Sequence, residues 1–576
     1  MAISSLISQK RSFGSVFFWG CCASGLGLVL LGLAWLVPNH YRPWPSFHSE
    51  MMAFIAVTLL FVGRMGHTGV AVALPRLALW LLLALAIPWL QLALGVSPFA
   101  GDAITVSFYL VGLLAAIAVG YGHGTAKSPV QASLLGVMHV LWIGALLSAC
   151  IGVLQYLGLE GWFDIFMTES GIGERVLGNL AQTNHLSTLL LMGVIGLAYL
   201  YEERRIGGPV LVLSVAFLTT VVVLTVSRSG LFSILAVVGY FVFKRRDAGS
   251  RLPLIGVVVW AATFLLATWV LPYLSQILLI GERGLSLEGT SGRTLMWKQI
   301  GYGILQQPFF GYGWNLTVRA QMPGAAQFPG ELSTDYAHNM LLDLLAWNGI
   351  PLGLVFAAAG AYWFISRCRR VYGVKAVYAF ACLVPLAVHS MVEYPFAYGY
   401  FLLPAGFMVG VVEASMQRSK EGSLRMGTGP VAMCTALWIA IGGYFVYEYF
   451  LIEEDFRMTR FENMRIGRTP ESYEIPSVWV SSHMAAMLRA TRTQPVPGMD
   501  PEALANLARV SSRFGYAALN YRYALALGLN GDPEGAAREM KMIRGMYGKW
   551  YYRTVSQEMR EQAESRYPQL KAVQIP

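Results

Sequence analysis

The sequence predicts an all-α fold, a polytopic membrane helix bundle with a small helical domain outside the membrane. The first observation is composition: 56% of the 576 residues are hydrophobic and only 13% are charged, whereas soluble domains carry roughly 25% charged residues. The second is a mean hydropathy of +0.52. The third is that apolar residues gather in runs close to the ~20 residues that cross a bilayer. Such a chain has too little polar surface for a soluble enzyme, a disordered protein or a nucleic-acid-binding domain.

The apolar runs predict about 13 spanning helices. We expect them at residues 15–37, 49–63, 77–96, 103–121, 132–157, 184–201, 208–226, 229–243, 253–275, 340–366, 374–392, 398–415 and 430–452. The first run is long enough to span, so we interpret it as a retained helix rather than a cleavable signal peptide.

Positive charge marks alternate connections between these runs. The basic set holds Lys10, Arg11, Arg64, Arg76, Lys127, Arg204, Arg205, Lys244, Arg245, Arg246, Arg251, Arg367, Arg369, Arg370, Arg418, Lys420 and Arg425. The other set holds Asp102, Glu160, Asp164, Glu169, Glu174, Glu282, Glu288, Glu331 and Asp335. Because basic connections stay in the cytoplasm, we expect a cytoplasmic N-terminus. The same sorting explains the net charge of +10 without a nucleic-acid partner.

Two long segments are then expected outside the cytoplasm, a loop at about 276–337 and a tail at 453–576. The tail follows a transmembrane domain of residues 1–452 and is polar, with apolar residues at helical spacing. Asp500 and Pro501 are typical of a helix N-cap and first helical position. The run 530–533, Asn-Gly-Asp-Pro, predicts a turn. The tail therefore resembles one tetratricopeptide-like hairpin, which predicts a small helical domain.

Arginines recur on the predicted outer side. Arg228 lies in a tight turn between two spanning helices, where an arginine is costly and usually has an anionic partner. Arg293 lies in the long outer loop, where Arg283 has a weaker context, and Arg175 lies in the preceding outer loop. Several guanidinium groups at one membrane face would suit a diphosphate, which they bind bidentately.

Histidines and carboxylates recur on the same side. His338 is expected to open a helix beside Asn339, with Asp335 three residues upstream, and a histidine there can accept a proton. His389 and Glu393 are four residues apart, which predicts one helix face. A hydrogen-bond network that only holds the bundle together fits these residues equally well. No Cys or His spacing is typical of a zinc site, and the six cysteines do not indicate a disulfide framework.

Several motifs together resemble a known family. The motifs that resemble the core of the O-antigen ligase and polymerase superfamily are Ser291-Gly292-Arg293, Pro308 to Gly313, His338-Asn339 and Gly349 to Gly353. Those that resemble its protein-glycosylating branch, the bacterial O-oligosaccharyltransferases of the PglL type, are Pro43 to Glu50, Gly178 to His185, His389 to Pro395, Tyr398 to Pro404 and the helical tail. Members of that branch often have Gly and Pro where this chain has Ala181 and Thr183.

The resemblance implies a function. A glycan on undecaprenyl diphosphate, at the periplasmic face of the bacterial inner membrane, is moved as one block onto a Ser or Thr hydroxyl of a periplasmic or pilin-like protein, without a metal or cofactor. Arg228 and Arg293, helped by Arg175 or Arg283, would stabilise the leaving diphosphate. His338 would accept the hydroxyl proton. The residues expected to shape the acceptor or sugar site are Gln182, Asn184, His185, Asp335, Asn339, His389, Glu393 and Tyr394.

Two alternatives stay open. The first is the same chemistry with another acceptor, either ligation of O-antigen onto lipid A core or O-antigen polymerisation. The helical tail and the Gln182/His185 motif argue against it. The second is a transporter or flippase of lipid-linked glycan. Transporters often contain internal repeats and place polar groups near mid-membrane, whereas this sequence has no evident repeat and its polar residues cluster at the predicted outer edge.

Overall fold

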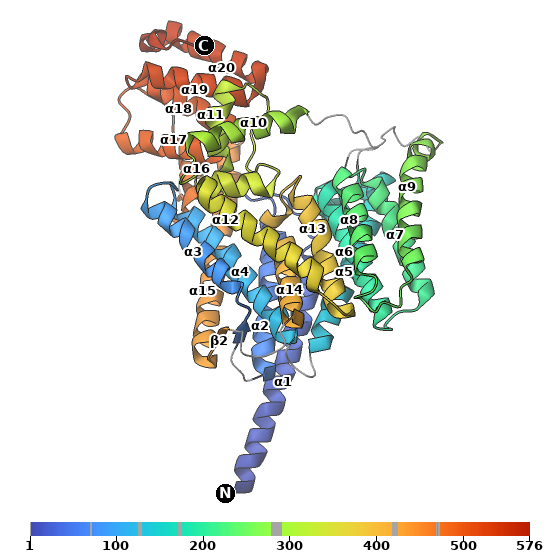
Figure 1. The fold of residues 1–576 in the computed structure, drawn as a ribbon. Helices are drawn as coiled ribbons and strands as arrows, with labels where there is room; N and C mark the ends of the chain where they lie inside the picture. The colour runs from blue at the N-terminus through green and yellow to red at the C-terminus, as the bar shows by residue number, and fades with distance from the viewer. Residues whose placement is uncertain are drawn as a thin grey trace. The chain divides into compact units, whose positions relative to one another are not determined.

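The computed structural model describes residues 2–68, 72–124, 130–170, 175–277, 291–416, 424–467, 469–470 and 473–575. Helices make up nearly all of the regular structure in these ranges, which confirms the all-α class (Figure 1). The chain divides into two compact units. Unit 1 comprises Met1–Leu82, Tyr109–Leu287 and Trp363–Ile441, and unit 2 comprises Leu83–Phe108, Glu288–Tyr362 and Gly442–Pro576.

Each predicted apolar run coincides with a helix. These helices are α1 (Ala2–Leu33), α2 (Phe47–Thr68), α3 (Ala78–Ala93), α4 (Ala100–Gly124), α5 (Val130–Tyr156), α6 (Thr183–Glu202), α7 (Gly208–Leu224), α8 (Arg228–Lys244), α9 (Leu254–Ile277), α12 (Met340–Arg370), α13 (Val374–Ser390), α14 (Gly399–Met416) and α15 (Thr428–Met464). Among the described residues, seven helices are long and apolar enough to cross a membrane, and five further apolar stretches are shorter. A polytopic membrane protein is confirmed, and the count of about 13 spans stays a prediction.

Helix α6 is the central helix of unit 1. Nearly all of its residues are buried, and it packs against α5, α7, α8 and α13. By contrast, α7 and α9 expose large apolar side chains such as Leu213 and Leu266. Apolar surface of this extent on a helix bundle is suited to lipid. The polar residues that α6 carries therefore lie inside protein, where each needs a hydrogen-bond partner.

Connections that carry basic residues pair with one another in unit 1. The strand β1 (Val72–Leu74), which follows α2, pairs antiparallel with β2 (Leu424–Met426), which precedes α15. At the end of α6, the carboxylate of Glu202 accepts the backbone N–H of Leu252, which precedes α9, at 2.8 Å. Two connections that bond directly lie on the same face of a bundle. These pairs agree with the predicted grouping of connections by charge.

The predicted outer loop contains two helices of unit 2, α10 (Ser291–Gln306) and α11 (Thr317–Gln327). The loop was predicted, but α11 was not. Pro323 lies inside α11. Because a proline disfavours the interior of a helix, this short polar stretch did not indicate a helix. Residues 278–290, which include Arg283, lie outside the described residues.

In the part of the tail that the structure describes, α15 continues to Met464 and five further α-helices of unit 2 follow it. They are α16 (Ser482–Arg492), α17 (Pro501–Phe514), α18 (Ala517–Leu529), α19 (Pro533–Met546) and α20 (Gly548–Ser565). The carboxylate of Asp500 accepts the N–H of Ala503 at 3.2 Å and caps α17, with Pro501 as its first residue. Residues 530–532 separate α18 from α19, as predicted. The local helix signals were correct, and the tail holds more than the one hairpin expected.

Helix α11 shares a hydrophobic core with the tail. Val318 and Ala325 of α11 are buried in one cluster with Met540 and Ile543 of α19, and α11 lies beside α17 and α19 (Figure 1). The approach is close, because a Cβ on Gly545 would stand 2.0 Å from the Ala325 carbonyl oxygen. The predicted outer loop and the predicted tail thus fold together. The functional division at residue 452, which falls within α15, stays a prediction.

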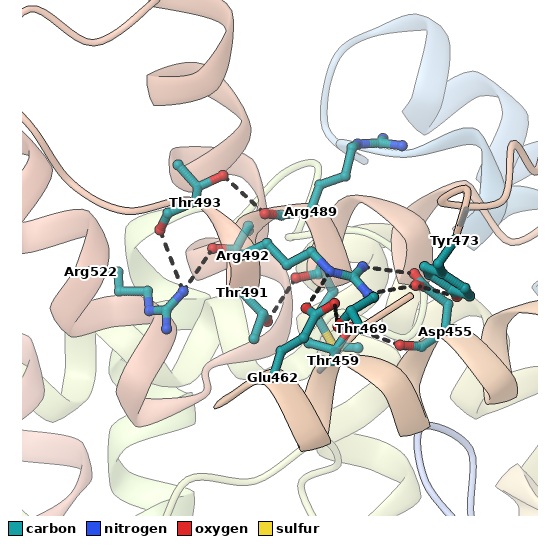
Figure 2. Close-up of polar contacts among 12 residues, drawn as sticks. Asp455, Thr459, Glu462, Thr469, Tyr473, Arg489, Thr491, Arg492, Thr493 and Arg522 are labelled. Atoms are coloured by element: carbon teal, nitrogen blue, oxygen red, sulfur yellow. Dashed lines mark hydrogen bonds and ion pairs between the residues drawn. The ribbon is translucent and has the colours of Figure 1, made fainter. Parts of the chain in front are cut away.

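An ion-pair cluster fixes α16 to the far end of α15 (Figure 2). The guanidinium of Arg492 donates to both oxygens of Asp455, at 2.7 and 3.0 Å, and to Glu462 at 2.8 Å. The hydroxyl of Tyr473 donates to Asp455 at 2.8 Å. Asp455 is buried, and a buried carboxylate needs such complete pairing. The tail is therefore joined to α15 by directional bonds as well as by the chain.

Candidate functional site

A glycine motif fills a break in α12 of unit 2. Gly349 has φ 75° and ψ 173°, so two helical segments meet there. The run Gly311 to Trp314 enters this break. Tyr312 N–H donates to the Ala346 carbonyl at 2.8 Å and Gly313 N–H to the Trp347 carbonyl at 3.2 Å. A broken helix frees backbone groups that a membrane cannot satisfy, and the glycine motif supplies their partners.

Gln91 of α3 completes the same junction. Its Nε2 donates to the Trp347 carbonyl at 2.7 Å, and its Oε1 accepts the N–H of Trp314 at 3.0 Å. The indole of Trp314 in turn donates to Asn348 at 2.6 Å. Two motifs that lie about 40 residues apart in the sequence thus form one hydrogen-bonded junction at the break in α12.

His338 lies just before α12 rather than at its first residue. The helix begins at Met340, because the Asn339 side chain accepts the N–H groups of Leu341 and Leu342 at 3.0 and 3.2 Å and so acts as the N-cap. His338 has φ 52°, a left-handed conformation that non-glycine residues rarely adopt. Strained backbone of this kind clusters at functional sites.

The imidazole of His338 is oriented by its own segment. Nδ1 lies 3.1 Å from the Tyr336 carbonyl oxygen and 3.5 Å from Oγ1 of Thr334. A carbonyl only accepts, so this geometry favours the proton on Nδ1. Nε2 is then the basic nitrogen of the ring. His338 is half-buried, and Asp335 beside it is exposed.

Buried groups beneath His338 fix the adjoining backbone. The Asp343 carboxylate is fully buried and accepts the N–H of Ala337 at 2.8 Å and the hydroxyl of Thr317 at 2.6 Å. The indole of Trp297 donates to the Ala337 carbonyl at 2.7 Å. Helices α10 and α12 therefore bond directly to the residue that precedes His338, and α11 bonds to the Asp343 carboxylate that holds it. Arg293 lies in the first turn of α10 with an exposed side chain.

In unit 1, a second group forms at the start of α8. Arg228 is the first residue of α8 and is half-exposed; the tight turn predicted for it is residues 225–227. Ser227 is the N-cap: its hydroxyl accepts the N–H of Gly230 at 3.1 Å and donates to Oδ1 of Asn184 at 2.7 Å. Arg175 Nε donates to the Thr225 carbonyl at 2.8 Å. The structure thus brings Arg175, Asn184 and the start of α8 together.

The electrostatics of this second group favour an anion. Helices α6 and α8 both begin here, and a helix N-terminus carries a partial positive charge. Arg228 adds a full positive charge at the same end of its helix, and an anion bound there would be attracted by both the guanidinium and the helix N-terminus. Arg175 adds another guanidinium, with Nη2 3.5 Å from Oδ1 of Asn184. Helix N-termini combined with guanidinium groups are typical of phosphate sites.

His185 and His389 lie deeper in unit 1. Both are fully buried, with ring centroids 5.5 Å apart. Nδ1 of His185 lies 3.1 Å from the Tyr400 hydroxyl, and Nδ1 of His389 lies 2.8 Å from Oγ1 of Thr188. These contacts fit the network that holds the bundle together as well as a substrate site. Nε2 of His185 is buried without a hydrogen-bond partner among the described residues.

Glu393 does not share a helix face with His389, contrary to the prediction. Helix α13 ends at Ser390, and Glu393 lies in the following turn, although its N–H still donates to the His389 carbonyl at 2.8 Å. Pro395 keeps the helix from continuing past this turn, because the residue before a proline avoids the helical region and Tyr394 has ψ 50°. The Glu393 carboxylate accepts Nδ2 of Asn184 at 3.3 Å, so it joins the group at the start of α8.

The remaining predicted residues of unit 1 lie close by. Gln182 precedes α6 at its N-cap position and is half-buried. The ring of Tyr394 stacks on Tyr398 at 5.8 Å between centroids, and Tyr398 contacts the His185 ring edge-on at 4.5 Å. The predicted site residues therefore form two sets, one in each unit, and Arg283 lies outside the described residues.

Sequence reasoning missed several polar residues that hold these groups. Ser227, Thr188 and Tyr400 contact the predicted residues directly, as described above. Gln155 of α5 is another: its side chain accepts the N–H of Gly178 at 2.8 Å and donates to the Thr168 carbonyl at 2.8 Å. A glutamine inside an apolar run was the available signal, since a polar residue within a span usually faces protein.

Three family models match parts of the chain. The model described as "Protein glycosylation ligase" matches residues 176–201, which include Gln182, Asn184 and His185. The model described as "O-Antigen ligase" matches residues 213–357, which include Arg228, Arg293 and His338. The model described as "Virulence factor membrane-bound polymerase, C-terminal" matches residues 377–562 and so runs from α13 into the tail.

Two characterised relatives come from Acinetobacter baylyi. One, a general O-oligosaccharyltransferase, is 29% identical over 481 residues, which cover 80% of each chain. The other, a ComP-specific O-oligosaccharyltransferase, is 27% identical over 395 residues, which cover 67% of this chain and 70% of the relative. The chain is thus similar over most of its length to bacterial O-oligosaccharyltransferases, and its resemblance to that branch of the O-antigen ligase superfamily is confirmed.

Proposed function

We propose that this chain is a glycosyltransferase that moves an oligosaccharide, as one block, from undecaprenyl diphosphate to a Ser or Thr hydroxyl of a periplasmic or pilin-like protein. The observation that carries the proposal is the group at the start of α8. There Arg175, Asn184 and Ser227–Arg228 come together within or beside segments that match the protein glycosylation ligase and O-antigen ligase models. Both relatives are oligosaccharyltransferases.

The donor diphosphate is assigned to the arginines. When the bond between the anomeric carbon and the diphosphate oxygen breaks, the electron pair leaves with that oxygen and negative charge grows there. Arg228, Arg175 and the N–H groups at the start of α8 would stabilise this charge, because fixed dipoles and guanidinium groups need little reorganisation as it develops. We assign the same role to Arg293 and extend it to Arg283 on the resemblance alone.

The acceptor proton is assigned to His338. The acceptor hydroxyl oxygen attacks the anomeric carbon, its proton moves to Nε2 of His338, and the configuration at that carbon inverts. The Tyr336 carbonyl, 3.1 Å from Nδ1, would stabilise the imidazolium that forms, as an acceptor on the second nitrogen does in other general-base histidines. The residues that would shape the acceptor or sugar site are Asp335 and Asn339 of unit 2 and Gln182, Asn184, His185, His389, Glu393 and Tyr394 of unit 1. No metal ion or cofactor takes part in this scheme.

The proposal places the protein in the bacterial inner membrane with the tail in the periplasm. The charge sorting of the connections supports this orientation. The pairing of β1 with β2 and of Glu202 with Leu252 agrees with it, because each links two connections assigned to the cytoplasmic side. Lipid-linked donor and acceptor protein would then meet outside the cytoplasm.

A second candidate keeps the chemistry and changes the acceptor. The match to the O-antigen ligase model over 213–357 fits ligation onto lipid A core or polymerisation equally well. A transporter of lipid-linked glycan is a third, and no observation in the structure favours it over transfer. These candidates differ in their product.

Reconstitution of the purified protein with a lipid-linked oligosaccharide tests the proposal. Separate reactions would contain a pilin-like protein with a Ser or Thr acceptor, lipid A core, or no acceptor. We expect a protein whose mass rises by one intact oligosaccharide, with the sugar on a hydroxyl side chain. Product on lipid A core alone would favour the ligase, and movement of the donor between leaflets without transfer would favour a transporter.

A further inference from the structure

The segment that carries His338 bonds both to α11 and to the helices of the tail in unit 2. We call residues 330–338 the His338 strap. Gln321 of α11 holds it: Nε2 donates to the Leu332 carbonyl at 2.6 Å, and Oε1 accepts the Thr334 N–H at 3.0 Å. Gln321 is fully buried. Thr334 is the residue whose hydroxyl lies 3.5 Å from the His338 ring, so this anchor is one contact from the imidazole.

The strap also bonds to the tail. The N–H of Gly330 donates to the Gly545 carbonyl at 2.7 Å, and the hydroxyl of Ser333 donates to the Gly515 carbonyl at 3.2 Å. Gly545 lies in the last turn of α19, and Gly515 is the C-cap of α17. The last four carbonyls of a helix have no partner within it. The strap therefore uses the free carbonyl ends of two tail helices as its acceptors.

Gly515 is shaped for this close approach. It has φ 57°, and a Cβ there would stand 2.4 Å from Cγ2 of Val318 and 3.2 Å from Oγ of Ser333. The hydroxyl of Tyr547 also donates to the Gly515 carbonyl, at 2.6 Å. The position of this carbonyl is thus set by α11, by the strap and by the start of α20 together. A shift of α17 would move the acceptor of Ser333 directly.

Helix α17 is itself locked by a buried ion pair. Nε of Arg513 donates to Oδ1 of Asp102, in the first turn of α4, at 2.7 Å, and both side chains are about nine-tenths buried or more. Burial alone lowers the pKa of Arg513, but the charges of Asp102 and, more weakly, of Asp335 outweigh it and raise that pKa. Asp335 belongs to the strap. The guanidinium therefore attracts the strap as well as α4.

We propose that the tail is a positioning device for His338, in which Arg513 and Ser333 are positioning residues. The inference rests on the proposed role of His338 as proton acceptor. Under this inference the tail affects the chemical step, because it sets the position of His338. A tail that only bound the acceptor protein would not affect that step. The physical reason is that the rate depends on the distance between the His338 ring and the acceptor hydroxyl. A misplacement of about 1 Å in a reacting group can reduce a rate roughly 100-fold, and the strap has no regular secondary structure of its own to hold its shape.

The test compares variants of the full-length protein. Ser333→Ala removes one hydroxyl and one hydrogen bond to the tail. Arg513→Gln leaves Asp102 buried without its cation, and Arg513→Lys restores the charge. The control is Arg509→Gln on the same helix α17, because the Arg509–Glu502 pair is largely exposed and exposed pairs contribute little. Reconstituted transfer from a lipid-linked oligosaccharide to a pilin-like protein gives kcat and the two KM values for each variant.

We expect Ser333→Ala and Arg513→Gln to lower kcat roughly 10- to 100-fold, with both KM values within about twofold of wild type. Arg513→Lys should recover part of the loss, and Arg509→Gln should match wild type. Because Arg513→Gln can also prevent folding, Ser333→Ala carries the test if that variant does not accumulate. Asp102→Asn combined with Arg513→Gln, which removes both charges, checks the ion pair itself.

Two results would overturn the inference. One is a raised KM for the acceptor protein with unchanged kcat in Ser333→Ala, which would make the tail a docking module. The other is wild-type kinetics both in Ser333→Ala and in the double variant that combines Asp102→Asn with Arg513→Gln. Both results require that the wild-type protein glycosylates the acceptor. Failure of the proposed function would be seen separately, as absence of glycoprotein from the wild type.

Discussion

Gly311 packs directly against Gly349: a Cβ atom on Gly311 would stand 2.5 Å from the backbone nitrogen of Gly349. This approach is what lets the N–H of Tyr312 reach the Ala346 carbonyl at 2.8 Å. The two glycine motifs, widely separated in the sequence, therefore serve one structure, a break in α12 whose backbone groups are satisfied. His338 lies at the start of the same helix, so the geometry of the break bears on its position.

Gly349→Ala should destabilise the protein strongly. Its φ of 75° and ψ of 173° lie in a region that is essentially restricted to glycine, at a cost of about 1–3 kcal/mol for other residues. A Cβ there would also stand 2.5 Å from the Phe309 carbonyl group. We expect a lower midpoint of thermal unfolding in detergent and reduced accumulation in membranes.

Gly360→Ala is the matched control, because Gly360 lies in the same helix with nothing within 4 Å of an added Cβ. Alanine in a helix interior is favoured over glycine by roughly 0.5–1 kcal/mol, so this variant should be as stable as wild type or slightly more stable. Equal unfolding midpoints for the two variants would contradict the break in α12.

The tail should lose stability as the pH falls. His483 is buried, with its ring parallel to Phe514 at 6.3 Å between centroids. Burial lowers its pKa from 6.5 to about 4, although Asp102 opposes the shift. Between these values the unfolded chain binds a proton that the folded chain excludes. The stability present above pH 6.5 is therefore lost on the way to pH 4, by about 2 kcal/mol at pH 5.

His483→Gln isolates this effect, because glutamine cannot be protonated in that range. Thermal unfolding of both proteins between pH 7.5 and 5 should show wild type losing more than the variant. Parallel curves would mean that His483 is accessible to protons in the folded state.

The structure shows which features the sequence could predict. Helix ends set by adjacent residues were predictable: Asp500 and Pro501 begin α17 as expected, because capping depends on a few neighbouring atoms. Apolar runs predicted where the apolar helices lie, because the composition of a run of about 20 residues indicates burial in lipid or protein. The break at Gly349 was not predicted, because hydropathy averages over a run and does not report backbone geometry.

Contacts between distant segments were also beyond prediction. Helix α11 is held by the core of the tail, through Val318 and Ala325, and its own sequence gives a weak helix signal. The residues predicted for the site were recognised one by one, from motifs and from the cost of a charge in a membrane. Their partners, such as Ser227 and Gln321, are ordinary polar residues whose role depends on which segments meet.

Reporter fusions should locate the N-terminus in the cytoplasm and the C-terminus in the periplasm. The expectation follows from the alternation of basic and acidic connections. Alkaline phosphatase fused after the tail should be active, and a fluorescent protein that folds only in the cytoplasm should report at the N-terminus. The reverse pattern would place His338 on the wrong side for a periplasmic acceptor.

Arg228→Lys should reduce transfer although it keeps the charge. Lysine has no planar guanidinium group and cannot bind a diphosphate bidentately. Arg293→Ala should also reduce transfer, with little change in stability, because its side chain is exposed. Both proteins should accumulate in the membrane at wild-type levels, which separates loss of chemistry from loss of folding. Near-normal glycosylation in both variants would remove the diphosphate assignment.

His338→Ala should abolish transfer while the lipid-linked donor still binds. The arginines hold the anionic leaving group, whereas the histidine acts on the neutral acceptor hydroxyl, so binding and chemistry should separate. Loss of a general base costs about 10²–10⁴-fold in rate, which corresponds to roughly 3–5 kcal/mol of barrier. Stability should change little, because the ring is only half-buried.

The measurement is the mass shift of an acceptor protein in a reconstituted reaction, with donor binding followed in parallel. His185→Ala is the informative comparison, because that ring is fully buried and its loss should lower stability as well as activity. Full transfer by His338→Ala would leave the transferase intact as a proposal and move the proton acceptor elsewhere, to His185 or His389. Loss of donor binding together with transfer would instead show that His338 belongs to the diphosphate site.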